Sequence, residues 1–104
     1  MKPLRPKDLK AVRRNAAEAA AMLRGLSHAA RLSVLCELLA GERSAGALVA
    51  TSGLSQSALS QHLAKLREQE LVATRREGQT IYYRLADRRL ERLIGVLHEL
   101  YCPE

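Results

Sequence analysis

Residues 54–67 read LSQSALSQHLAKLR, and this stretch has two distinct faces when it is drawn as a helix. On a wheel of ~100° per residue, Leu59, Leu63 and Leu66 cluster within roughly 60° and mark the buried side. The neighbouring sector is roughly 140° wide and carries uncharged side chains: Gln56, Ser57, Ser60, Gln61 and Ala64. The stretch therefore predicts a helix that presents a neutral polar face outward.

That polar face has the composition of a helix that reads DNA bases. A solvated helix face usually carries Lys and Glu, whereas Gln and Ser can both donate to and accept from base edges. Gln pairs bidentately with adenine, so Gln56 and Gln61 are the first candidates for base readout. Ser57 and Ser60 are candidates for base or phosphate contacts. An ordinary solvated face is the alternative for this helix taken alone.

A second short helix precedes this one. Ser44 can cap a helix that carries Leu48, and the segment Thr51–Leu54 contains Gly53 and is a turn signal, followed by the cap candidate Ser55. Two short helices joined by such a turn predict a helix-turn-helix over residues 44–68.

A β-hairpin is predicted over residues 71–85, where the helical period gives way to strand-forming residues. Its strands are residues 71–76 and 80–85, and residues 77–79 form the turn. Basic side chains of this hairpin are candidates for phosphate or minor-groove contact: Arg75, Arg76 and Arg84. Lys65 and Arg67, at the end of the preceding helix, are candidates for the same contacts.

The first and last helices are predicted over residues 8–26 and 87–102, after a flexible segment of residues 1–7. Asp87 is a cap candidate for the last helix. Both helices carry a single apolar seam; in the first it consists of Leu9, Val12, Ala16, Ala19, Leu23 and Leu26. Matching seams at the two ends of so short a chain predict dimerisation helices, because a second copy would supply missing apolar burial.

Two cysteines are too few and too distant in sequence for a secreted disulfide scaffold. Cys36 lies in a second helix, for which Ser27 is the cap candidate, on one stripe with Leu32, Leu35 and Leu39. Cys102 lies at the end of the last helix. If these two helices pack together, the thiols could meet, and oxidation or sulfur insertion would link the helices covalently.

Composition favours one domain, residues 1–104, with a polyanionic partner. The chain has 104 residues, 17 Lys and Arg against 11 Asp and Glu, and a formal charge of +6. Its core must be built from Leu, Val and Ala, because the chain lacks Phe and Trp. Nucleic acid and an anionic membrane surface both fit the charge.

Other function classes find little support in the sequence. The chain has neither a Gly-rich phosphate loop nor a spaced cluster of His and carboxylates, so neither an enzyme nor a cofactor is expected. No run of 18 apolar residues predicts a membrane span, and the charged start, with Pro3 and Pro6, lacks an apolar signal core. A cytoplasmic protein is therefore expected.

The runs over residues 54–67 and 71–85 resemble the recognition helix and wing of ArsR/SmtB-type bacterial repressors, and the resemblance extends over residues 23–103. It implies a winged helix-turn-helix, mainly α with a small β-hairpin. It also implies a homodimer, joined through the first and last helices, that binds a palindromic operator in double-stranded DNA and releases it when an inducer is sensed.

Within that family the chain looks most like the branch of SqrR, BigR and HlyU, because of the positions of Cys36 and Cys102. This resemblance implies sensing of reactive sulfur species or oxidants by the cysteine pair. The patterns of the metal-sensing branches are missing: residues 44–52 hold no Cys, and Arg89 and Leu100 stand where imidazoles are expected.

Three alternatives stay open at this point. Cys36 can be a small buried hydrophobe without chemistry. A Zn- or Cd-type metal site could use Cys36, His98 and Cys102, the last two on one helical face. A winged helix can also bind another protein instead of DNA.

Overall fold

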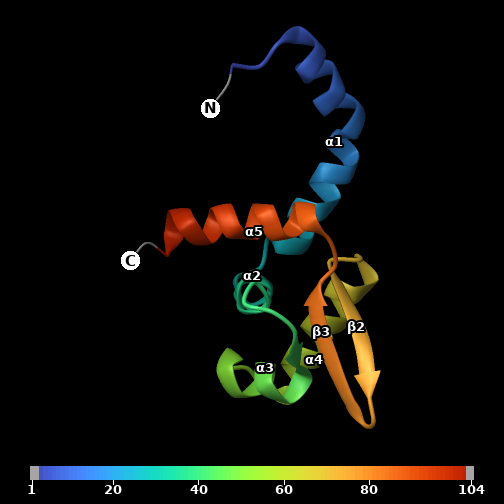
Figure 1. Ribbon diagram of the computed structural model, residues 1–104, viewed down its shortest axis with the longest axis vertical. Helices are drawn as coiled ribbons and strands as arrows, with labels where there is room; N and C mark the ends of the chain where they lie inside the picture. The colour runs from blue at the N-terminus through green and yellow to red at the C-terminus, as the bar shows by residue number, and fades with distance from the viewer. Residues whose placement is uncertain (1–2, 103–104) are drawn as a thin grey trace.

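Five helices and a small antiparallel sheet make up the computed structural model over the residues that it describes, 3–102 (Figure 1). In chain order the elements are α1 (Pro6–Leu26), α2 (Ala29–Leu38), β1 (Arg43–Ser44), α3 (Ala45–Ser52), α4 (Gln56–Glu68), β2 (Val72–Glu77), β3 (Thr80–Leu85) and α5 (Arg88–Tyr101). The predicted fold class, mainly α with a small β-hairpin, is confirmed. None of the described helices is both long enough and apolar enough to cross a membrane.

The sheet has one strand more than the predicted hairpin. Its order is β1-β3-β2, and the short strand Arg43–Ser44 pairs with Tyr83 and Tyr82 of β3. Two residues are too few to show the alternation by which a strand is recognised, so sequence reasoning missed β1. β2 begins at Val72 rather than at the predicted Leu71, because the Leu71 N–H still donates to the Leu66 carbonyl at the end of α4.

Two helix ends differ from the prediction. α1 begins at Pro6, inside the segment predicted as flexible, because Pro suits the first turn and Asp8 accepts a hydrogen bond from the Arg5 N–H at 3.0 Å. Met1 and Lys2, also part of that prediction, lie outside the described residues. The predicted cap Ser27 instead ends α1, and α2 is capped by His28, whose Nδ1 accepts from the Ala30 N–H at 3.2 Å.

The core is built around α2, which packs against α1, α3, α4 and α5 (Figure 1). Because neighbours surround it, its buried side is wider than the predicted stripe and includes Val34 and Leu38 beside Leu35. Side chains of the three later helices join these residues in one cluster, among them Leu59, Leu63 and Leu66 of α4 and Leu90 and Ile94 of α5. The core therefore holds α4 rigidly by one face.

Much of the apolar seam of the two terminal helices stays uncovered. α1 runs away from the rest of the molecule (Figure 1), and Leu9, Val12 and Leu23 are exposed. On α5, Leu100 and Tyr101 are 67% and 79% exposed. Large apolar side chains gathered on two helices are typical of a surface that a partner covers.

Candidate nucleic-acid interface and thiol cavity

The predicted polar face of α4 is exposed along its whole length, with Gln56, Ser57, Ser60 and Gln61 open to solvent. Within residues 3–102 none of these four side chains makes a hydrogen bond, so their donors and acceptors are available to a ligand. The opposite face is anchored: Leu59, Leu63 and Leu66 are at most 3% exposed. A rigid helix with an unoccupied hydrogen-bonding face can read a groove.

Local hydrogen bonds set the direction of α4. The Ser55 Oγ accepts from the Ala58 N–H at 3.1 Å and caps the helix, as predicted. The turn before it uses Gly53 at φ 73°, where a side chain would be strained, and the Ser52 Oγ accepts from the Leu54 N–H. α3 and α4 are therefore joined by the short glycine turn that a helix-turn-helix needs.

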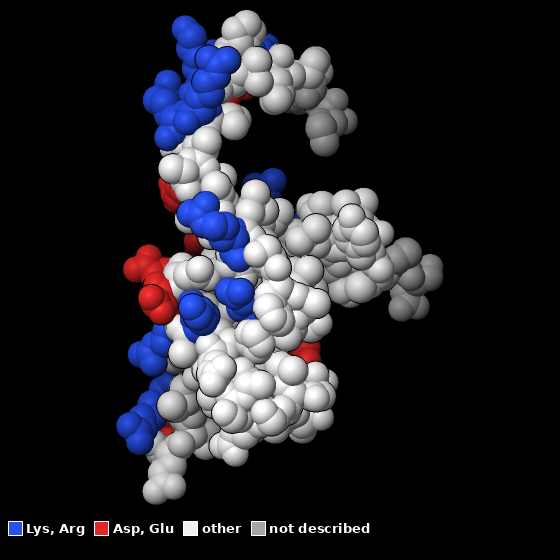
Figure 2. Space-filling model, turned by 180° about the vertical axis from the view of Figure 1, so that it is seen from behind, with Lys and Arg blue, Asp and Glu red and all other residues white. Residues whose placement is uncertain are grey.

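Positive charge lies beside this helix. Lys65 and Arg67 are exposed in its last turn, and Arg67 borders an open hollow of about 530 Å³ between α4 and Tyr83 of β3. Figure 2 shows Lys and Arg along the edge formed by the wing, β2 and β3, with a second group on the N-terminal part of α1. The edge beside α4 is therefore suited to phosphate groups.

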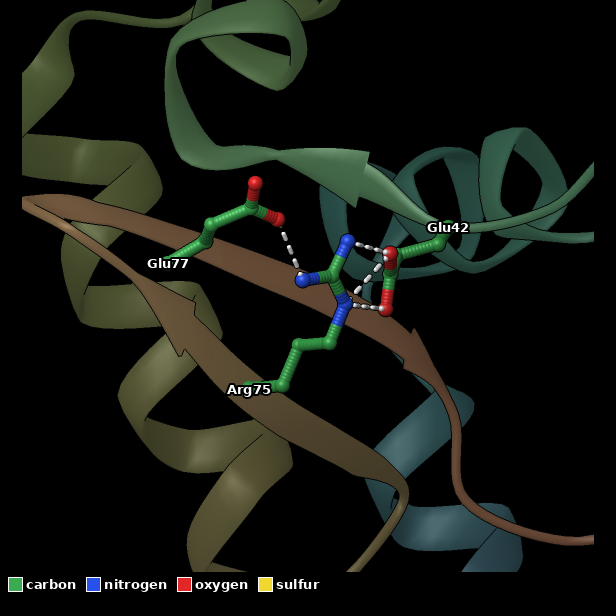
Figure 3. Close-up of polar contacts among 3 residues, drawn as sticks. All are labelled: Glu42, Arg75 and Glu77. Atoms are coloured by element: carbon green, nitrogen blue, oxygen red, sulfur yellow. Dashed lines mark hydrogen bonds and ion pairs between the residues drawn. The ribbon is translucent and has the colours of Figure 1, made fainter.

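The three wing arginines occupy different environments. The strand register places Arg75 and Arg84 on one face of the sheet and Arg76 on the other. The Arg76 Nε donates to the Gly78 carbonyl at 3.0 Å, within its own turn. Arg75 is held by Glu42 and Glu77, as Figure 3 shows. Sequence reasoning grouped the three because it could not see Glu42 approach from another element.

Cys36 and Cys102 line one cavity of about 570 Å³ between α2, α3 and α5. Both are free thiols; Cys36 is half-buried and Cys102 is exposed. Burial raises the pKa of the Cys36 thiol, and the neighbouring Cys102 raises it further. One thiol is thus open to reagents, and the environment of the other favours its protonated form.

A hydrogen bond joins this cavity to the helix-turn-helix. Thr51 of α3 donates through its Oγ1 to the carboxylate of Glu37, and both residues line the cavity. Glu37 follows Cys36 directly in α2. The hydrogen bond therefore connects α3 to the turn of α2 that carries Cys36.

The alternative metal site is not formed. His98 lines the cavity with Cys36 and Cys102. Yet among residues 3–102 no three His, Cys, Asp or Glu side chains lie close enough together to hold a metal ion.

Two histidines meet between the start of α2 and α4, a contact that sequence reasoning did not foresee. The rings of His28 and His62 lie 4.6 Å apart, centre to centre, at 56°. The pKa of His62 is lowered, first by its burial and then by His28 and Arg31 beside it. No spacing in the sequence connects the two residues.

We expect the lowered pKa of His62, caused first by its burial, to make the fold less stable in acid. A histidine whose pKa is lower in the folded than in the unfolded state adds its full stabilisation to the fold above about pH 6.5. This stabilisation is lost as the pH falls through the pKa of the folded state. The melting temperature should therefore drop between about pH 7.5 and about pH 5. The drop should be smaller in His62→Gln; an equal drop in both proteins would assign it to other groups.

Comparisons with known proteins agree with this geometry. Residues 28–74 match the family model described as bacterial regulatory protein, arsR family. The transcriptional activator HlyU of Vibrio cholerae is 45% identical over 97 residues, covering 93% of this chain and 90% of HlyU. The biofilm growth-associated repressor of Agrobacterium fabrum is also 45% identical over 97 residues, covering 92% and 83%.

The chain belongs to the ArsR family of bacterial regulatory proteins. Two solved structures support its fold. The transcriptional repressor BigR of Xylella fastidiosa superimposes with a TM-score of 0.84 at 37% identity, covering 97% of this chain and all of BigR. A homodimeric winged helix-turn-helix DNA-binding domain of Mycobacterium bovis gives 0.74 at 27% identity, covering 96% and 89%.

This ArsR-family protein is a transcriptional regulator. Its relatives HlyU and BigR are those of the predicted branch, so that assignment and the winged helix-turn-helix are confirmed. They are named as regulators of transcription, which confirms the prediction that the chain is not an enzyme.

Proposed function

We propose that this regulator is a repressor that binds double-stranded operator DNA through α4 and the wing, and that it releases the operator when Cys36 and Cys102 become linked. The observation that carries the proposal is the unoccupied polar face of α4 beside a basic edge. In this proposal Gln56, Ser57, Ser60 and Gln61 face the bases, and Lys65, Arg67, Arg76 and Arg84 face phosphates.

The working unit is a homodimer formed through α1 and α5. The exposed apolar side chains of both helices support it, and the related M. bovis domain is described as homodimeric. Two copies related by a twofold axis present two copies of α4, which fits a palindromic site.

Reactive sulfur species or oxidants act at the thiol cavity. The exposed Cys102 reacts first: its thiolate attacks a sulfane sulfur atom of a polysulfide and becomes a persulfide, while the shortened polysulfide leaves with the electron pair of the broken S–S bond. The Cys36 thiol then loses its proton to water, its thiolate attacks the Cys102 Sγ, and hydrosulfide leaves with the electron pair of the broken S–S bond. The resulting bridge ties α2 to α5 beside the Glu37–Thr51 contact and shifts the dimer away from its DNA-binding geometry.

Polysulfide treatment is expected to join Cys36 to Cys102 within one chain, because both thiols line one cavity. Mass spectrometry of proteolytic fragments would show the joined peptides, and Cys102→Ser should abolish them. Two unlinked thiols in protein that has released its DNA would contradict the mechanism. DNA release is measured with a duplex that the protein itself selects from a random-sequence library, which we call the selected duplex.

A further inference from the structure

Arg75 lies across the outer face of the sheet and is held at several points (Figure 3). Its Nε donates to both carboxylate oxygens of Glu42 at 2.8 and 2.9 Å, and its Nη2 lies 2.7 Å from the same carboxylate. Its Nη1 donates to Glu77 at 2.7 Å. The guanidinium carbon is 4.4 Å from the centre of the Tyr82 ring. Three neighbours therefore fix the orientation of one side chain.

The register shows what this side chain connects. Arg75 of β2 pairs with Tyr82 of β3, and Tyr82 pairs on its other side with Ser44 of β1. Glu42 directly precedes β1. Arg75 thus starts on one edge strand, passes over the middle strand and ends on the segment that leads into the other edge strand.

That segment belongs to the start of the helix-turn-helix. Ser44 caps α3, its Oγ accepting from the Ala47 N–H at 3.1 Å, and Glu42 stands two residues before it. The two-residue strand β1 offers few ladder hydrogen bonds to hold the wing there. The Glu42–Arg75 contact adds a bidentate ion pair over an aromatic ring, a geometry with more directional preference than a simple surface pair.

The charge of Arg75 is already compensated. Arg75 with Glu42 and Glu77 sums to one negative charge, and the hydrogen bond from Arg75 lowers the pKa of Glu42 and so favours its charged form. A phosphate would meet two carboxylates there. Arg76, on the opposite face, has no ion pair within the described part of the chain.

We propose that Arg75 is a positioning residue that locks the wing to the helix-turn-helix through Glu42, while its neighbour Arg76 contacts phosphate. This revises the sequence-based assignment of Arg75 to phosphate. It rests on the proposed function, because the wing is positioned for DNA.

Salt dependence separates the two roles. Each phosphate contact makes the negative slope of log affinity against log salt concentration steeper by about 0.9, whereas a positioning residue leaves this slope unchanged. Fluorescence anisotropy with the selected duplex at several salt concentrations should show Arg75→Ala binding about tenfold more weakly, as expected for lost preorganisation, with the slope unchanged. The control Arg76→Ala should flatten the slope by about 0.9.

Glu42→Ala gives the sharpest contrast, because it removes a negative charge near DNA. Electrostatics alone would tighten binding, whereas the lock predicts a loss similar to that of Arg75→Ala. Arg75→Lys keeps the charge without the planar fork and should fail to rescue binding. A flattened slope in Arg75→Ala with tighter binding by Glu42→Ala would overturn the proposal, and so would unchanged affinity in both.

A measurement without DNA distinguishes this inference from the proposed function. Amide hydrogen exchange should be faster at Arg43, Tyr82 and Tyr83 in Arg75→Ala and in Glu42→Ala than in the unaltered protein, because the three-stranded pairing loosens. Unchanged exchange in both variants would refute the lock. If the unaltered protein selects no duplex, the proposed function fails, and the exchange experiment still decides the lock.

Discussion

Gln61→Ala is expected to weaken binding of the selected duplex by roughly 5- to 150-fold, which corresponds to the ~1–3 kcal/mol of one bidentate base contact. Gln61 is exposed on α4, outside the Leu59–Leu63–Leu66 face that anchors the helix. The melting temperature should therefore stay unchanged, and so should the salt slope, because Gln is neutral. Anisotropy titrations and thermal melts measure all three quantities.

The matched control is Gln69→Ala. Gln69 is also an exposed glutamine but is the C-cap of α4, beside Gly25 of α1. It should bind the selected duplex like the unaltered protein. Equal losses from the two substitutions, or no loss from Gln61→Ala, would remove α4 from the role of recognition helix.

Leu59→Ala should lower the free energy of unfolding by about 2–5 kcal/mol, as truncation of a buried leucine does. Leu59 is 1% exposed and belongs to the cluster that joins α4 to α2. Small domains have only about 5–15 kcal/mol in total, so much of the protein should be unfolded at elevated temperature. Urea unfolding followed by circular dichroism gives the midpoint and slope from which the loss is calculated.

Ser60→Ala, on the next residue, is the control for this experiment. Ser60 is exposed and borders the hollow beside Arg67. The free energy of unfolding of the Ser60→Ala protein should therefore change by less than about 0.5 kcal/mol, while its DNA binding weakens. A Leu59→Ala protein as stable as the unaltered one would mean that α4 is not anchored through this face.

Local interactions made much of the fold predictable. The caps Ser44, Ser55 and Asp87 each accept from a backbone N–H three residues ahead, a contact encoded within one helical turn. Ser27 was wrongly predicted to cap α2, because a serine hydroxyl can also donate to a carbonyl of the preceding turn. Ser27 does so to the Arg24 carbonyl at 2.8 Å. A serine between two helices fits either role, and only packing decides which.

Contacts between residues far apart in the chain could not be predicted from the sequence. The lock between Glu42 and Arg75 depends on a two-residue strand without a pattern, and the His28–His62 contact depends on how α2 and α4 pack. The shared cavity of Cys36 and Cys102 was foreseen only under the condition that α5 packs on α2, which the structure satisfies.

The most direct test of thiol-controlled DNA binding compares the reduced and the polysulfide-treated protein on the selected duplex at several salt concentrations. The reduced protein should bind with the steep salt dependence of phosphate contacts, and treatment should weaken binding roughly 5- to 150-fold, the range of a coupling of ~1–3 kcal/mol. Cys36→Ser and Cys102→Ser should each abolish this response. Equal affinity before and after treatment, in a protein shown to carry the Cys36–Cys102 bridge, would contradict the account.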